Sequence, residues 1–150
     1  KPLEFYAAYF TVKQSGFDAE LMLEKRNISK AIKELENAPN TTAKEEETLS
    51  VLYIVAEMYA RGIEFLPVDI FKSDSFAFIP ENGKIRLPLS SLNVLGASAA
   101  ENIHKAVISG EVMTVDDLKR QASLTKTVME ILKKNNCLGN LPESHQLTLF

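Results

Sequence analysis

Four carboxylates in this 150-residue sequence could bind a metal ion of the kind that assists phosphoryl transfer. They are Asp69, Asp74, Asp116 and Asp117. However, Asp116 and Asp117 fall in the first turn of a predicted helix, where the helix dipole stabilises carboxylates without a metal. The "SDS" at 73–75 is typical of a turn. The sequence also shows no phosphate-binding loop, no dinucleotide loop and no nucleophile paired with a base.

The two histidines, His104 and His145, do not indicate a metal site either. Neither has a Cys, Asp or Glu at metal-ligand spacing. We expect His104 within a helix and His145 near the end of the sequence, both at the surface. The sequence therefore predicts no catalytic centre and no metal.

A turn that could bind phosphate is present in "LNVLGASAAENIHKA" (92–106), which has the pattern of a helix-hairpin-helix element. In such an element, backbone N–H groups and the N-terminus of the second helix hold a DNA phosphate without reading sequence. Gly96 supplies one expected glycine, but Val94 stands where the other is usual and Asn93 where proline is usual. Because a β-branched residue at positive φ is an outlier, the turn either has another shape or no longer binds phosphate. The alternative is an ordinary helix–turn–helix corner in which Gly96 is a packing residue.

The sequence ends in "QLTLF", where apolar and polar residues alternate. One interpretation is a linear motif: Leu147 and the Leu149–Phe150 pair enter a hydrophobic cleft while the Gln146 amide hydrogen-bonds at its rim. The other is a short final strand with Leu147 and Leu149 on one face. A glycine and a proline separate these residues from the last predicted helix, which favours the linear motif.

Helices are the main elements expected to position these residues. Residues 3–12 are apolar nearly all round, and their alanines and their length favour a buried helix over a strand. Asp18 should cap an amphipathic helix over 19–37. Thr42, with a glutamate three residues later, has the pattern of a capping box and begins a third helix that ends at Gly62.

The second half begins with a β-rich stretch. "ENGK" (81–84) is a strong hairpin signal, and "EFLPVD" could lie alongside that hairpin. Helices are then expected over Ala97–Ser109, after an N-cap at Thr114, and from about Thr125 to Asn135.

Composition excludes several classes of protein. A hydrophobic content of 45% and a charged content of 25% are usual for a folded chain. The net charge of −3 is not a basic footprint, so any contact with nucleic acid should be local, weak and salt-sensitive. The single cysteine, Cys137, excludes an internal disulfide and fits a cytoplasmic setting. No apolar run approaches the roughly 20 residues that span a membrane.

Seven stretches, in order along the whole chain, resemble the C-terminal end of the alpha subunit of bacterial DNA polymerase III. The resemblance is strongest to the PolC type of low-G+C Gram-positive bacteria. The stretches are "PLEFYAAYFTV", "RGIEFLPVDIFKSDSFAFI", "LNVLGASAAENIHKA", "GEVMTVDDL", "LTKTVMEIL", "NNCLGNLPE" and "QLTLF".

This resemblance implies three functional parts. Residues 1–62 would be a helical piece of the fingers, 63–139 a β-hairpin with a helix-hairpin-helix-like region that binds duplex DNA, and 140–150 a flexible tail with a sliding-clamp-binding motif. The motif residues carried over to this sequence are Leu95, Gly96, Ala97 and Ser98 for DNA, and Gln146, Leu147, Leu149 and Phe150 for the clamp.

The resemblance also implies the partners and the chemistry. The partners would be double-stranded DNA, bound weakly and non-specifically, the beta sliding clamp, and the remainder of the polymerase alpha subunit, with no membrane involved. The catalytic aspartates and their Mg²⁺ belong to the palm of such polymerases, and no motif here matches them. They would lie upstream of Lys1, so this chain would hold no cofactor and would not polymerise DNA alone.

Two other interpretations remain open from the sequence. One is a stand-alone helix-hairpin-helix protein for DNA binding or repair that is recruited to the clamp. The apolar "AAYFTV" start disfavours it, because so apolar a segment needs a partner surface. The other is a helical adaptor with no role at nucleic acid.

Overall fold

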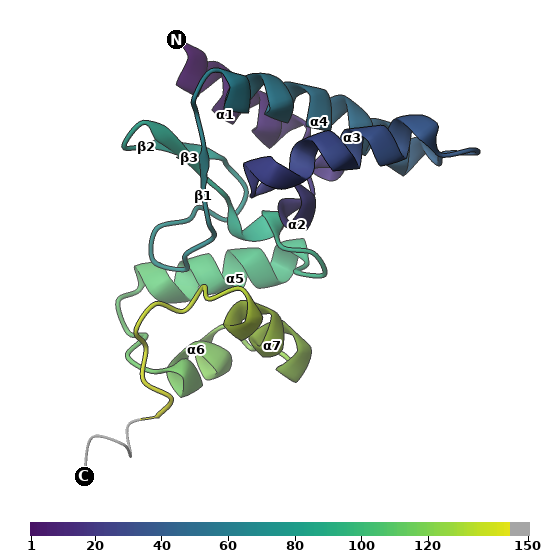
Figure 1. Ribbon diagram of the computed structural model, residues 1–150. Coiled ribbons are helices and arrows are strands. Elements are labelled where there is room, and N and C mark those ends of the chain that lie inside the picture. Colours follow the sequence, from purple (N-terminus) through teal and green to yellow (C-terminus); the bar gives the residue numbers. More distant parts are fainter. Residues whose placement is uncertain (145–150) are drawn as a thin grey trace. The chain divides into compact units, whose positions relative to one another are not determined.

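The architecture is mainly helical, with one small three-stranded sheet (Figure 1). The computed structural model describes residues 1–144 and confirms the predicted fold class, mainly α with a small β-hairpin. Packing divides the chain into two units. The first comprises Lys1–Pro67 and Ala77–Leu87, and the second comprises Val68–Phe76 and the chain from Pro88 onward. The division into three functional parts stays a prediction.

The first unit contains helices, short 3₁₀ turns and the sheet. Its elements are α1 (Pro2–Val12), η1 (Gln14–Gly16), α2 (Ala19–Met22), η2 (Lys25–Asn27), α3 (Ile28–Asn37), α4 (Ala43–Ala60), β1 (Phe65–Leu66), β2 (Ile79–Glu81) and β3 (Lys84–Arg86). Pro2 stands in the first turn of α1, where its missing N–H costs nothing because that donor has no partner within the helix. The helical interpretation of residues 3–12 is therefore confirmed.

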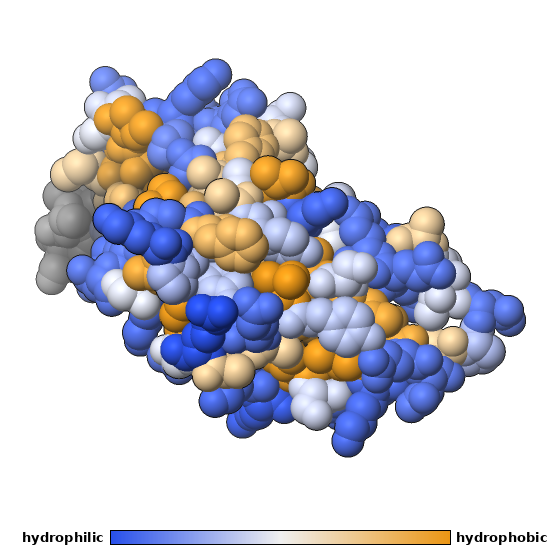
Figure 2. All heavy atoms as spheres, turned by 90° about the horizontal axis from the view of Figure 1, so that it is seen from above, coloured by the Kyte–Doolittle hydropathy of each residue, from blue (hydrophilic) through white to orange (hydrophobic). Residues whose placement is uncertain are grey.

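A cluster of phenylalanine rings forms the core of the first unit around Phe10, which is fully buried. The Phe10 ring centroid lies 5.7 Å from that of Phe17, 5.3 Å from that of Phe65 and 5.6 Å from that of Phe78. These separations suit edge-to-face and tilted pairs. The opposite side of α1 exposes 58% of Phe5, and the face seen in Figure 2 shows apolar patches among hydrophilic side chains. The apolar helix α1 is therefore buried on one side by its own unit and exposes Phe5 on another.

The prediction of one continuous helix over residues 19–37 is wrong. The chain instead forms α2, η2 and α3, and Glu24 is extended, with φ −109° and ψ 123°. The buried Tyr59 hydroxyl lies 2.7 Å from the carbonyl oxygens of both Met22 and Leu23. In a continuous helix, those carbonyls would accept from amides four residues later. The single hydroxyl hydrogen of Tyr59, from α4, is thus shared between the two carbonyls at the break.

The capping and turn signals of the first unit are confirmed. The Asp18 side chain accepts hydrogen bonds at the start of α2, and Thr42 and Glu45 form a capping box at the start of α4. Asn82 and Gly83 have φ of 52° and 79°, the positive values that a two-residue hairpin turn of type I′ requires. The strand β3 pairs antiparallel with β2 and parallel with β1, so the "EFLPVD" segment does join the hairpin.

In the part of the second unit that the structure describes, three helices pack with one 3₁₀ turn. They are η3 (Leu89–Ser91), α5 (Ala97–Ile108), α6 (Val115–Gln121) and α7 (Lys126–Lys134). One fully buried side chain from each helix contributes to the core, namely Ile103, Leu118 and Leu132. Thr114 and Asp117 form a capping box at the start of α6, as expected. Within residues 1–144, no helix combines the length and the apolar character needed to cross a bilayer.

The last described residues are attached to the second unit, and we call residues 137–143 the C-terminal strap. The amides of Val115 and Asp116, at the start of α6, donate to the carbonyls of Pro142 (2.8 Å) and Glu143 (3.2 Å). These bonds satisfy two donors that have no partner within the helix. The tail expected to be flexible is therefore bound to α6 over its first residues.

Candidate nucleic-acid interface

The turn before α5 has the hairpin geometry despite its valine. Val94 has φ 70°, so it adopts the left-handed conformation that a glycine usually supplies. Leu95 is buried and anchors the turn, and Gly96 is the N-cap of α5, with φ −70° and ψ 164°. Val94 thus keeps the positive φ that this turn requires, and binding of phosphate by the turn stays a prediction. One difference is that η3, a single 3₁₀ turn, precedes the hairpin in place of a longer first helix.

Gly96 has no packing role, so the ordinary-corner interpretation of this residue is wrong. A Cβ added at Gly96 would meet nothing within 4 Å. Its negative φ is also open to any residue. No side chain caps α5, and the amides of Ala97 and Ser98 stand in its first turn, where helices lack internal partners. The space before this helix end is therefore open to the close approach of a ligand.

Replacing Val94 with glycine is expected to raise the free energy of unfolding by about 1 kcal/mol. The left-handed conformation costs a residue with a side chain about 1–2 kcal/mol, and glycine avoids this cost. Part of the resulting stabilisation is lost because glycine gives the unfolded chain more conformational entropy. Val94 is 80% exposed, so little apolar burial is lost. Urea denaturation measures the change. Val94→Ala is the matched control, because it keeps the Cβ; equal gains for both variants would contradict the strain.

A second turn of the same kind lies between α6 and α7. Ser123 has φ 54°, Leu124 is buried, and Thr125 is the N-cap of α7, with φ −78° and ψ 164°. The order is that of the first turn: a residue at positive φ, a buried leucine, an extended N-cap and a helix. This turn could not be predicted by likeness to the first, because the two turns share only the leucine. The signal that could have found it is a leucine directly before an N-cap, at the start of each helix.

The helices that follow the two turns differ electrostatically from α4 and α6. The first turns of α4 and α6 carry carboxylates, which neutralise the positive end of the helix dipole, whereas those of α5 and α7 carry none. Lys126 is the first residue of α7, a position that the dipole disfavours for a cation. Lys119 and Arg120 stand shortly before the second turn. An anion at these helix ends would therefore be stabilised.

A hollow of about 230 Å³ lies beside the second turn. Its charged lining residues are Asp116, Lys119, Lys126, Glu130, Lys133 and Glu143. Lys133 Nζ lies 3.5 Å from a carboxylate oxygen of Glu143. Because cations and carboxylates are mixed here, the local field is moderate, which agrees with weak and salt-sensitive binding of anions.

The side chains that could have formed a metal site have structural roles. Asp69 and Asp74 accept hydrogen bonds from the amides two residues later, as in turns. A surface position was expected for His104, but its side chain is half-buried. Its Nε2 lies 3.9 Å from Asp74 Oδ1. Burial raises the pKa of the Cys137 thiol to about 12, so it is protonated at neutral pH. Among residues 1–144, no group of three or more His, Cys, Asp or Glu side chains could hold a metal ion.

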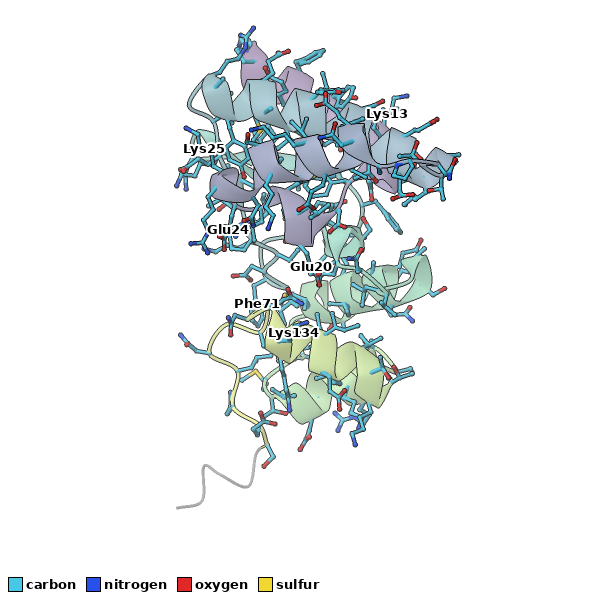
Figure 3. All side chains as sticks on the ribbon, turned by 45° about the vertical axis from the view of Figure 1, so that its right-hand side comes forward. Lys13, Glu20, Glu24, Lys25, Phe71 and Lys134 are labelled. Carbon is cyan, nitrogen blue, oxygen red and sulfur yellow. The ribbon has the colours of Figure 1, made fainter. Side chains whose placement is uncertain are left out.

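The first unit has a larger hollow, of about 650 Å³, beside the segment between α2 and α3. Figure 3 labels Glu24 and Lys25 on this segment. The Arg26 guanidinium lies 2.6 Å from the Glu24 carboxylate. Lys84 Nζ, in β3, lies 3.4 Å from the carboxylate of Glu64, the residue before β1. Two of the three cations that line this hollow, Arg26 and Lys84, are therefore paired with carboxylates, and Lys25 is the third.

The structure thus describes one of the two predicted sites. Leu95, Gly96, Ala97 and Ser98 lie together at the hairpin turn. The predicted clamp residues Gln146, Leu147, Leu149 and Phe150 lie outside the described residues. His145 does too.

Comparison with known proteins agrees with the hairpin geometry. The family described as "Helix-hairpin-helix motif" matches residues 62–147. The chain is 42% identical over 150 residues to a protein of Thermotoga maritima named "DNA polymerase III PolC-type". It is also 42% identical to the protein of that name from Caldanaerobacter subterraneus subsp. tengcongensis, and 38% identical to that from Bacillus subtilis. Each match covers 99% of this chain but only 10–11% of the relative. The chain therefore belongs to the helix-hairpin-helix family, and its homologues over nearly its whole length are PolC-type DNA polymerases III.

Proposed function

We propose that this chain is the C-terminal part of a PolC-type DNA polymerase III alpha subunit, where it holds duplex DNA behind the active site and docks on the beta sliding clamp. Its similarity to one continuous stretch of polymerase favours this over a stand-alone accessory protein. The nucleotidyl transfer and its Mg²⁺ belong, in this proposal, to the palm of the parent polymerase. Its work in replication would place it in the cytoplasm.

Gly96 is the observation that carries the DNA contact. It has neither a packing role nor a positive φ, and it opens a helix whose first turn holds no carboxylate. Such an end suits a phosphate, which backbone amides can reach closely because no Cβ intervenes. The second turn would hold another phosphate before α7, next to Lys126. Contacts of this kind ignore base sequence, so the polymerase can advance along its product.

The clamp contact rests on the sequence "QLTLF" and on the family resemblance. Leu147, Leu149 and Phe150 would fill a hydrophobic cleft, and Gln146 would bond at its rim. A motif of modest affinity suffices because it is tethered to a polymerase already on DNA, which raises its effective concentration. Docking of this kind can exchange without release of the DNA.

Replacing Lys126 with glutamate is expected to weaken binding of duplex DNA about tenfold at low salt. The change removes a cation beside the proposed phosphate and adds an anion there, so the slope of log affinity against log salt should also fall by about one. Fluorescence anisotropy with a labelled duplex measures both quantities.

Lys105→Glu is the matched control for this experiment. Lys105 is exposed in the last turn of α5, about 12 Å along that helix from its start. It should lose much less affinity than Lys126→Glu. Equal losses would mean that only net charge matters, and no loss at Lys126 would exclude the second turn from the DNA contact.

A further inference from the structure

The exposed side of α1 carries an apolar stripe, formed by Phe5, Ala8 and Val12. Phe5 is 58% exposed, Val12 is 79% exposed, and Ala8 is exposed between them. Positions 5, 8 and 12 follow the three- and four-residue spacing of one helix face. The Phe5 ring stacks on that of Tyr9, with centroids 6.4 Å apart. Glu4 is the one charged residue of α1, so the apolar stripe lacks the polar character of a solvated helix face.

A hollow lies beside the Phe5 ring. It has a volume of about 350 Å³, and its lining residues are Lys1, Pro2, Phe5, Tyr6, Glu57 and Arg61. The Tyr6 hydroxyl donates to the Glu57 carboxylate, and Arg61 Nε lies 3.7 Å from the same carboxylate. These polar groups are therefore already paired within the first unit. A protruding ring beside a hollow is a relief on which the side chains of a packed partner can interdigitate.

The extent of the relatives indicates what covers this face. The PolC-type polymerases match 99% of this chain over only 10–11% of their own length, so most of such a polymerase lies outside this segment. A second copy is the weaker candidate. The 11 residues of α1 make a helix about 16 Å long, and one face of it offers far less than the roughly 800 Å² that each partner of a stable complex buries. Segments of one polypeptide can pack over a smaller area, because their connection removes most of the entropic cost of association.

We propose that the apolar stripe of α1 and the hollow beside it form the surface through which this segment packs on the rest of a PolC-type polymerase chain. The partner surface is apolar and supplies a side chain that enters the hollow. This inference rests on the proposed function, because it requires a polymerase of which this chain is one part. It adds that α1 is buried on both sides in the whole enzyme, by the Phe10 cluster on one side and by the remaining polymerase on the other.

Thiol labelling at residue 12 tests whether the apolar stripe is covered. Val12→Cys places a thiol at a strongly exposed position, whereas the natural Cys137 is buried and protonated and so reacts slowly. The variant is made in the 150-residue chain and in the full-length polymerase. Mass spectrometry of the peptide that contains residue 12 follows its reaction with a maleimide. We expect the reaction to be about tenfold slower in the full-length polymerase, because a covered thiol excludes the reagent.

Lys30→Cys is the matched control, because Lys30 lies on α3 of the same unit and its side chain is 82% exposed. It should react at the same rate in both proteins. Ala8→Cys gives a second position on the apolar stripe and should repeat the result at residue 12. Equal rates at residues 8 and 12 in the two proteins would overturn the proposed surface. Slower reaction at residue 30 as well would also overturn it, since the shielding would not be specific to α1.

Two further outcomes separate this inference from its alternatives. A reaction at residue 12 that slows as the concentration of the 150-residue chain rises would overturn the surface in favour of a second copy as the occupant. A full-length enzyme that polymerises DNA but reacts equally fast at residue 12 would overturn the surface alone. A full-length protein without polymerase activity would instead remove the proposed function on which the surface rests.

Discussion

Removal of residues 146–150 is expected to abolish binding of this chain to the beta sliding clamp. The deletion takes away three apolar side chains, and complete burial of each contributes about 1.5–3 kcal/mol. If the intact chain binds in the micromolar range, the loss of even two of them weakens binding by roughly a hundredfold or more. Calorimetry with the intact chain and a version that ends at His145 would show heat of binding only for the intact chain.

Two point variants make this test specific for the motif. Leu149→Ala combined with Phe150→Ala should lose binding nearly as fully as the deletion, since both side chains are anchors in the proposed cleft. Thr148→Ala should bind normally, because that position tolerates variation in the motif. Binding that survives the deletion would exclude "QLTLF" as the docking peptide and leave a DNA-holding module.

Replacing Glu81 with alanine is expected to lower the free energy of unfolding by about 3 kcal/mol. The Arg86 side chain is only 7% exposed; its Nε donates to Glu81 Oε1 at 3.0 Å, its Nη2 donates to Glu81 Oε2, and its Nη1 donates to the Pro67 carbonyl at 2.9 Å. Without the carboxylate, the buried guanidinium keeps, among residues 1–144, the neutral Pro67 carbonyl as its hydrogen-bond partner. Removal of one member of such a pair costs about 3–5 kcal/mol because the remaining charge is uncompensated. Urea denaturation followed by circular dichroism measures the loss.

The same sheet offers a matched control in the exposed pair of Glu64 and Lys84. These side chains lie 3.4 Å apart but are 60% and 46% exposed, so solvent screens their attraction. Glu64→Ala should therefore cost less than about 1 kcal/mol. Combining Glu81→Ala with Arg86→Met should recover part of the loss, because no buried charge then remains. Similar costs for Glu64→Ala and Glu81→Ala would show that burial does not strengthen the Arg86 pair.

The sequence by itself determined the elements whose signals are local. Asp18, Thr42 and Thr114 each cap a helix at the predicted residue, because a capping side chain bonds to amides only two or three positions later. The Asn82–Gly83 turn was predictable for the same reason, since positive φ at two successive residues requires such types. The start of α5 at Ala97 was also predicted from the sequence.

Tertiary structure alone decided the features that depend on distant residues. At the break near Glu24, the Tyr59 hydroxyl, from another helix, lies within hydrogen-bond distance of the carbonyls of Met22 and Leu23. Tyr59 is 36 residues from Leu23, beyond the range of helical periodicity. The attachment of the C-terminal strap is of the same kind, since the amides that donate to the carbonyls of Pro142 and Glu143 come from α6.

The conformation of Val94 and the surroundings of Gly96 were also decided only by the folded structure. A β-branched residue at positive φ opposes its intrinsic preference, and burial of the neighbouring Leu95 offsets that local cost. Whether a glycine packs against neighbours depends on atoms that only the folded chain brings near it. A Cβ added at Gly96 would meet no such atom within 4 Å. Local hydrogen bonds could be predicted from the order of residues, whereas contacts between distant segments were decided only by the fold.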